Sequence, residues 1–191
     1  GPSGSGKSTI TKLMAGFWDV TSGHIIYGCQ DIRNIPTSQI MKHISFVSQD
    51  NFLFNISIKE NIRMGNPCDT DEEVLAAAQA ARCDEFIRKM EYGYDTLVGD
   101  AGGKLSGGER QRITIARAIL KPADVVILDE ASAYADPENE VYIEEAINEL
   151  VKDKTLIVVA HRLETIENSD RSLVGEKGRM GAEGTPGELL D

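Results

Sequence analysis

The first nine residues, GPSGSGKST, constrain the fold of this chain more than any other stretch. The spacing Gly1-x-x-x-x-Gly6-Lys7-Ser8 is the pattern of a phosphate-binding loop, which leads from a buried strand into a helix. Glycines allow the backbone N–H groups of such a loop to converge on phosphate oxygens, and the positive end of the helix adds to the attraction. A flexible Gly/Ser linker is the alternative, but the apolar residues that follow recur at helical spacing, which a linker lacks.

The composition is typical of a globular domain and excludes several classes of protein. Of the 191 residues, 41% are hydrophobic and 27% are charged, and the longest apolar runs are far shorter than the roughly 20 residues of a membrane helix. A formal charge of −11 without a Lys/Arg-rich stripe argues against DNA or RNA as a ligand. The 3 cysteines are too scattered for a metal motif and odd in number, so we expect reduced thiols in a cytosolic compartment.

Polar residues follow three predicted strands at the ends where ligands of open α/β sheets bind. The three stretches typical of strands are HISFVSQD, VVILDEAS and LIVVAHR. The second and third are apolar on both faces, which predicts buried parallel strands. The polar residues at their carboxyl ends are Gln49, Asp129, Glu130 and His161. We expect all four at the edge of the sheet where the phosphate-binding loop lies.

The pair Asp129-Glu130 is the strongest partner for that loop. With Lys7 at the β- and γ-phosphates and the Ser8 hydroxyl on Mg²⁺, a first acid at the strand end can bind the metal directly or through water. The second acid is then placed to accept a proton from an attacking water. The alternative is a pair of solvated acids at a strand end.

The stretch LSGGERQR, residues 105–112, has a structural explanation and a functional one. Ser106 and Glu109 match the capping box of a following helix. Capping does not require Gly107 and Gly108, which are poor helix residues. Two glycines at a helix start expose N–H groups to a ligand that approaches closely, and an anion is the natural candidate.

Taken together, these motifs resemble the ATP-binding domain of an ATP-binding-cassette (ABC) transporter. The resemblance rests on the phosphate-binding loop, Gln49, LSGGERQR, VVILDEAS, Asp136 and VVAHR, in this order. It covers nearly the whole chain, and LSGGE separates the family from other P-loop ATPases. Three further stretches, NFLFNISIKENIRMG, GYDTLVGDAGGKLSGGERQR and AHRLETI, are similar to the exporter-type branch, whose ATPase and membrane domains usually share one polypeptide.

The resemblance implies a role for each motif residue. ATP would be bound by Gly1, Ser3, Gly4, Ser5, Gly6, Lys7, Ser8 and Thr9. Mg²⁺ would be contacted by Ser8, Gln49 and Asp129. Glu130 would be the general base, His161 would hold the γ-phosphate and orient the water, and Gln49 would also sense the membrane domain. ATP and Mg²⁺ are therefore the implied cofactors, and ATP hydrolysis that drives transport across a membrane is the implied activity.

The resemblance also implies partners. The signature residues Ser106, Gly107, Gly108 and Glu109 would act on ATP held by a second ATPase domain, arranged head to tail, with Asp136 at the dimer contact. A membrane domain, expected on the same full-length chain, would meet VGDAGG at the cytoplasmic face of a membrane. Glu109 replaces the more usual glutamine, and Ala-Tyr-Ala precedes Asp136 instead of Ser-Ala-Leu, which weakens the detail of that contact.

The expected fold is α/β: a P-loop NTPase (RecA-like) core with a parallel sheet and an inserted helical subdomain. The core is predicted at residues 1–49 and 116–191, and the helical subdomain, with the signature motif, at residues 50–115. The family has strands before the phosphate-binding loop that are missing here, so we expect a fragment of a longer transporter. Gly175 and Gly181 fall within a predicted C-terminal hairpin, which we expect to be frayed or poorly packed.

Two other interpretations remain open at this stage. The first is an ABC-type ATPase without a transporter, acting in DNA repair, on chromosomes or on ribosomes. Chromosome-type members insert long coiled coils between the glutamine and the signature serine, whereas the interval from Gln49 to Ser106 is compact and lacks heptads. The second is an inactive fragment with intact motifs.

Overall fold

The computed structural model describes residues 4–48, 50–129, 137–159, 169–176 and 178–190. Its α-helices are α1 (Lys7–Met14), α2 (Thr37–His43), α3 (Ile58–Arg63), α4 (Asp71–Ala80), α5 (Asp84–Ile87), α6 (Gly107–Leu120), α7 (Pro137–Leu150) and α8 (Pro186–Leu190). Its strands are β1 (Ile26–Tyr27), β2 (Gln30–Asp31), β3 (Ile44–Val47), β4 (Val125–Asp129), β5 (Thr155–Val159), β6 (Ser172–Glu176) and β7 (Arg179–Gly184). Short 3₁₀ turns lie at Ile32–Asn34, Gly93–Asp95 and Asp100–Gly102. Within these residues, no helix is both long and apolar enough to cross a bilayer.

The central sheet is parallel, with the strand order β3-β4-β5. Strand β4 is buried on both faces, as VVILD predicts: Val126 and Leu128 belong to one hydrophobic cluster and Ile127 to another. Strand β5 was also expected to be buried, and this prediction is wrong, since only Val159 of its five residues is buried. The reason is that, among the described residues, β5 pairs with β4 alone and lies at the edge of the sheet.

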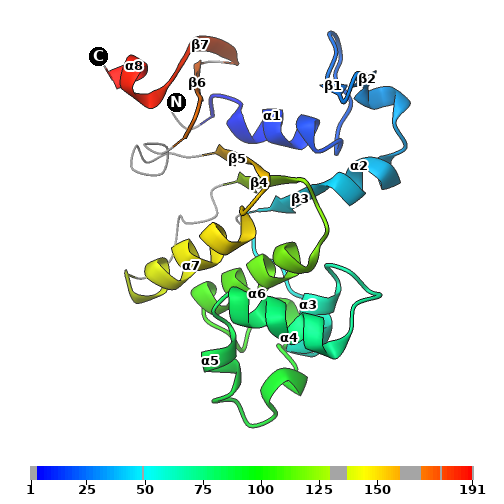
Figure 1. Ribbon diagram of the computed structural model, residues 1–191, viewed down its shortest axis with the longest axis vertical. Coiled ribbons are helices and arrows are strands. Elements are labelled where there is room, and N and C mark those ends of the chain that lie inside the picture. Colours follow the sequence, from blue (N-terminus) through cyan, green and yellow to red (C-terminus); the bar gives the residue numbers. More distant parts are fainter. Residues whose placement is uncertain (1–3, 49, 130–136, 160–168, 177, 191) are drawn as a thin grey trace.

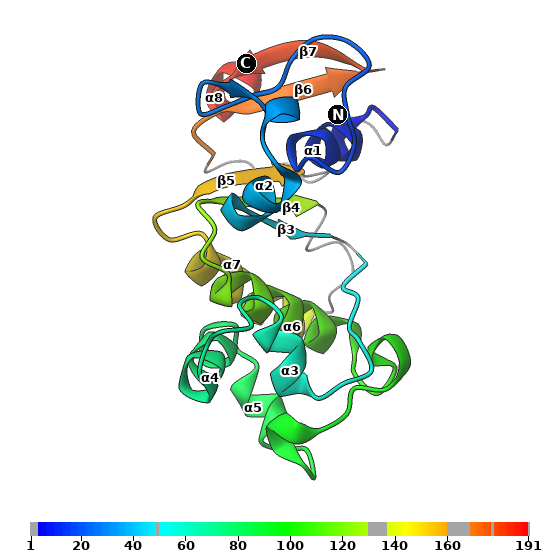
Figure 2. The same cartoon turned by 90° about the vertical axis from the view of Figure 1, so that its right-hand side faces the viewer.

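Helices cover both faces of this sheet (Figures 1 and 2). Helices α1 and α2 lie on one face, over the smaller cluster, which contains Ala15, Ile40 and Ile127. Helices α6 and α7 lie side by side on the other face, with α3, α4 and α5 beyond them. The larger hydrophobic cluster runs through this side without a break and joins residues of β3 and β4 to α3, α4, α6 and α7.

Local signals set the helix boundaries. Thr70 accepts the Glu73 N–H while the Glu73 carboxylate accepts the Thr70 N–H, which forms a capping box at the start of α4. The same reciprocal pair forms between Ser106 and Glu109 at the start of α6. Helix α7 begins at Pro137, the first helical position, where its missing N–H has no cost.

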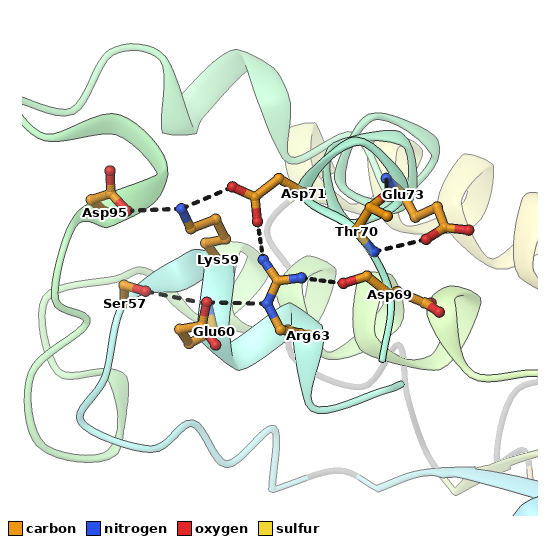
Figure 3. Close-up of polar contacts among 9 residues, drawn as sticks. All are labelled: Ser57, Lys59, Glu60, Arg63, Asp69, Thr70, Asp71, Glu73 and Asp95. Atoms are coloured by element: carbon orange, nitrogen blue, oxygen red, sulfur yellow. Dashed lines mark hydrogen bonds and ion pairs between the residues drawn. The ribbon is translucent and has the colours of Figure 1, made fainter. Parts of the chain in front are cut away.

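A surface network of charges holds α3 against the start of α4 (Figure 3). Lys59 lies between Asp71 and Asp95, at 3.3 and 3.4 Å, and Arg63 contacts Asp71 and Glu60. Hydrogen bonds from Arg63 and then from Lys59 lower the pKa of the Asp71 carboxyl. Because exposed pairs are screened by solvent, this network contributes little to the free energy of unfolding.

The C-terminal hairpin of β6 and β7 was expected to be frayed or poorly packed, and the second alternative holds. Its strands pair from Ser172↔Gly184 to Glu176↔Arg179, with one irregularity between Val174 and Gly175. Backbone pairing does not need side chains, which is why glycines do not prevent it. The packing is poor, as expected: Leu173 and Met180 are 62% and 65% exposed.

Candidate functional site

The phosphate-binding loop has the backbone geometry that its glycines predict. Gly4 and Gly6 have φ angles of 76° and 96°, in the region that residues with a Cβ rarely adopt. Gly6 is the N-cap of α1 and has no side chain with which to cap the first N–H groups of the helix, and the first turn of α1 holds no acidic residue. These uncapped donors and the positive helix end suit an anion.

The loop is joined to the central strand through Ser8. Its hydroxyl donates a hydrogen bond of 2.8 Å to the Asp129 Oδ1 atom, at the end of β4. Asp129 is buried and Ser8 half-buried. A hydroxyl and a carboxylate that meet at a phosphate site fit Mg²⁺, which uses one or two protein oxygens together with substrate phosphates and water. The structure thus brings together two of the three residues predicted to contact the metal.

A second contact supports the loop and has no sequence signal. The Gly178 N–H, in the turn between β6 and β7, donates to the Ser5 carbonyl at 3.1 Å. Ser5 itself is buried, and the Lys7 ammonium lies 3.4 Å from its hydroxyl. Thr9 is exposed on the first turn of α1. The hairpin therefore lies against the predicted nucleotide-binding residues, a long-range contact that no local pattern indicates.

Several predicted site residues lie outside the described part of the chain. They are Gly1, Ser3, Gln49, Glu130, Asp136 and His161. The register of the sheet aligns the ends of its three strands, since Val47 pairs with Leu128 and Asp129 pairs with Val159. The carboxyl ends of β3, β4 and β5 therefore lie at one edge, and Ser8 joins that edge through Asp129.

The four signature residues differ in exposure, and Glu109 is half-buried. Ser106 and Gly107 are exposed at the start of α6, whereas Gly108 is buried. A Cβ on Gly108 would lie 2.6–2.9 Å from the Asn139 side chain, so this glycine has a packing role that sequence reasoning missed. Helix α6 lies on the opposite face of the sheet from α1 (Figure 2). The signature residues at the start of α6 and the loop before α1 therefore belong to helices on opposite faces of the sheet.

An exposed aromatic segment follows β3. Phe52 and Phe54 are 53% and 46% exposed and contact each other edge to face, with ring centroids 5.1 Å apart. The Asn55 side chain donates to Asp100 at 3.1 Å, so this segment lies beside the VGDAGG stretch. Exposed aromatic rings next to a polar loop are typical of a protein–protein contact surface.

A buried side chain holds the aromatic segment in place. Asn61 accepts the Phe54 N–H at 3.0 Å and donates to the Phe54 and Ser57 carbonyls. Arg117 of α6 donates to both the side-chain and the backbone oxygen of Asn61. Burial lowers the pKa of Arg117. Sequence reasoning missed Asn61, because a buried asparagine within a helix has no signal of its own.

Taken together, a glycine-turned loop at a helix N-terminus and an acid at the end of a central parallel strand define the P-loop nucleotide-binding class. Residues 1–133 match the profile of the ABC transporter family. The chain belongs to this family, which confirms the resemblance of its motifs.

Relatives and a solved structure agree with this family over the whole chain. A Bacillus subtilis (strain 168) protein, provisionally named a multidrug export ATP-binding/permease protein, is 48% identical over 191 residues. A Staphylococcus aureus (strain NCTC 8325) protein with the same provisional name is 46% identical over 190 residues. The structure of a bacterial Atm1-family ABC exporter with ATP bound has a TM-score of 0.91 and 40% identity over 99% of this chain. The chain spans 33% of the length of each.

Proposed function

We propose that this chain is the ATP-binding and ATP-hydrolysing part of an exporter-type ABC transporter, in which hydrolysis drives a substrate across a membrane. The observation that carries the proposal is the 2.8 Å hydrogen bond from Ser8 to Asp129, which joins the phosphate-binding loop to the acid of the central strand. Family membership and relatives with joined ATP-binding and permease parts support it. In this proposal residues 1–49 and 116–191 form the ATPase core, and residues 50–115 the helical subdomain.

Each side chain of the core then has a task. The N–H groups of the loop and the Lys7 ammonium bind the phosphates, and Ser8 and Asp129 hold Mg²⁺, which neutralises phosphate charge when bound. Glu130 accepts the proton of the attacking water, and His161 orients that water against the γ-phosphate. Gln49 contacts the metal and reports on the membrane domain.

Two partners complete the proposal. The exposed Ser106 and Gly107 act on ATP held by a second copy of the domain or by a related one, in a head-to-tail dimer with Asp136 at its contact. The position of α6 on the sheet face opposite α1 favours this use of the signature in a partner. The aromatic segment at Phe52 and Phe54, beside VGDAGG, meets the membrane domain at the cytoplasmic face.

The test is ATP turnover by the complete protein with Glu130→Gln. We expect a loss on the order of 10²- to 10⁴-fold, because only proton acceptance is removed, with ATP binding retained. The matched control is Glu138→Gln, which makes the same change in the sequence that follows Asp136. Parental turnover by Glu130→Gln would contradict the assignment of the base. A second outcome is that Glu130→Gln abolishes ATP turnover but membrane vesicles containing the parent protein show no ATP-dependent transport. That outcome would favour an ATPase that is not part of a transporter.

A further inference from the structure

Asn139, in the first turn of α7, is packed directly on the second signature glycine. A Cβ built on Gly108 would lie 2.6 Å from Asn139 Cγ, 2.8 Å from its Cβ and 2.9 Å from its Oδ1 atom. Real Cβ atoms do not approach other atoms so closely, so alanine at Gly108 would force α6 and α7 apart. A Cβ on Gly107 meets only the end of the flexible Arg110 side chain, at 4.0 Å.

Arg112, one turn further along α6, also contacts Asn139. It is buried, and its Nη2 atom donates to Asn139 Oδ1 at 3.0 Å while its Nη1 atom donates to the Arg82 carbonyl at 2.9 Å. Its guanidinium carbon lies 4.8 Å from the Phe86 ring centroid and 5.2 Å from that of Tyr142. A buried guanidinium with two ring contacts and two directed hydrogen bonds has little freedom to reorient.

These contacts join the signature to the helix that follows Asp136. Gly108 and Arg112 lie on α6, and Asn139 lies on α7, which runs beside α6 in both views (Figures 1 and 2). The exposed Ser106 and Gly107 belong to the turn of α6 that is held in this way. At the start of the two helices, their position relative to α7 is therefore set by contacts of Asn139 and Arg112, in addition to the hydrophobic cluster further along α6 and α7.

We propose that Asn139 and Arg112 are positioning residues for the signature, and that Gly108 is glycine because Asn139 occupies the space of a Cβ. By fixing the first turn of α6 on the first turn of α7, they set where Ser106 and Gly107 meet the γ-phosphate held by the partner domain. This inference rests on the proposed function, in which the signature acts on that ATP. In this proposal Asn139 and Arg112 act through the signature and not on the nucleotide itself.

The test compares Asn139→Leu with Asn139→Asp in the complete transporter. Leucine keeps the volume but removes the acceptor for Arg112, whereas aspartate keeps an acceptor oxygen at the same place. We expect Asn139→Leu to raise the KM for ATP roughly two- to tenfold, the equivalent of one ordinary hydrogen bond, and Asn139→Asp to stay within twofold of the parent. ADP lacks the γ-phosphate, so its affinity is expected to be unchanged in both variants.

A merely structural role would lower ADP affinity along with the affinity for ATP, or affect both variants equally, and either result would overturn the inference. Ser106→Ala is the control for the underlying function and is expected to raise the KM for ATP. If Ser106→Ala has no effect, the proposed function of the signature fails and this inference fails with it. If Ser106→Ala acts and Asn139→Leu does not, only the positioning role is wrong.

A second measurement does not depend on catalysis. Gly108→Ala is expected to lower the Tm of the protein, and its effect should shrink when Asn139→Gly is already present, since all three close atoms are then removed. Gly107→Ala is the matched control and is expected to have a similar small effect in both backgrounds. An equal cost of Gly108→Ala with and without Asn139→Gly would overturn the packing explanation.

Discussion

The helical region formed by α3 to α7 and the C-terminal hairpin of β6 and β7 are packed in opposite ways. In the helical region, Ile62, Val74 and Ile113 have no exposed surface, whereas Leu173 and Met180 in the hairpin are more than half exposed. Burial of apolar surface is the main favourable contribution to folding. The stability of the described chain therefore lies chiefly in the helical region and the sheet face beneath it.

The phosphate-binding loop contacts both the end of the central strand β4 and the C-terminal hairpin. On one side Ser8 is hydrogen-bonded to Asp129, which is buried at the end of the central strand. On the other side the Gly178 N–H of the hairpin turn donates a hydrogen bond to the Ser5 carbonyl. A ligand that binds this loop only in the folded form will stabilise the protein.

The largest effect is expected for core truncation in the helical region. Ile113→Ala removes a fully buried side chain from the larger hydrophobic cluster and should cost about 2–5 kcal/mol of unfolding free energy. Met180→Ala, in the exposed hairpin, should change it by no more than about 0.5 kcal/mol. Urea unfolding of both variants measures the difference. Equal costs would show that the two regions are packed alike and would break the comparison.

The elements of the fold were predictable where a local signal sets them. The caps at Thr70 and Ser106, the start of α7 at Pro137 and the buried strand β4 follow from neighbouring residues. The exposure of β5 did not follow, because an apolar strand looks the same in the sequence whether one or two neighbours pair with it. For the hairpin, the glycines predicted the poor packing of its side chains, while the backbone pairing forms despite them.

The candidate site was predictable as a set of residues but not as a set of contacts. The motif spacing predicted that Ser8 and Asp129 would serve the same metal, and the structure places them in hydrogen-bond contact. It did not predict that Gly178 would support the loop or that Asn139 would cover Gly108. These contacts join residues far apart in the chain, so they depend on how the elements pack. The roles of Gln49, Glu130, Asp136 and His161 stay predictions.

Helix caps offer a finer comparison of the two regions. Thr70 caps α4 in the helical region, and Thr185 caps the five-residue α8 after the hairpin through Glu188. Thr70→Ala should cost about 1 kcal/mol of global unfolding free energy. Thr185→Ala should cost less in the same urea titration, because α8 can fray without unfolding the rest. A larger cost at Thr185 would contradict the view that the C-terminal part is the less tightly coupled region.

The smallest expected effect is the acid sensitivity of the charge network on α3. The pKa of Asp71 is lowered by Arg63 and Lys59, so the folded protein holds this carboxylate ionised more firmly than the unfolded chain does. Its contribution is present above the unfolded pKa of about 4 and is lost as the pH falls through the lowered folded value. The Tm difference between the parent and Asp71→Asn should therefore shrink below about pH 4. A difference that grows on acidification would show the opposite sign.

The central claim is that the loop and the end of β4 form one binding site for Mg·ATP. The direct measurement is the affinity of the complete protein for ATP, with and without Mg²⁺, in the parent and in Lys7→Ala and Ser8→Ala. Lys7→Ala should weaken binding about 10- to 100-fold under both conditions, because a charged hydrogen bond to phosphate is lost. Ser8→Ala should weaken it only when Mg²⁺ is present, because in the proposed function Ser8 and its hydrogen-bond partner Asp129 both contact the metal. ATP affinity that is unchanged in Lys7→Ala, or a Ser8→Ala effect independent of Mg²⁺, would contradict the account.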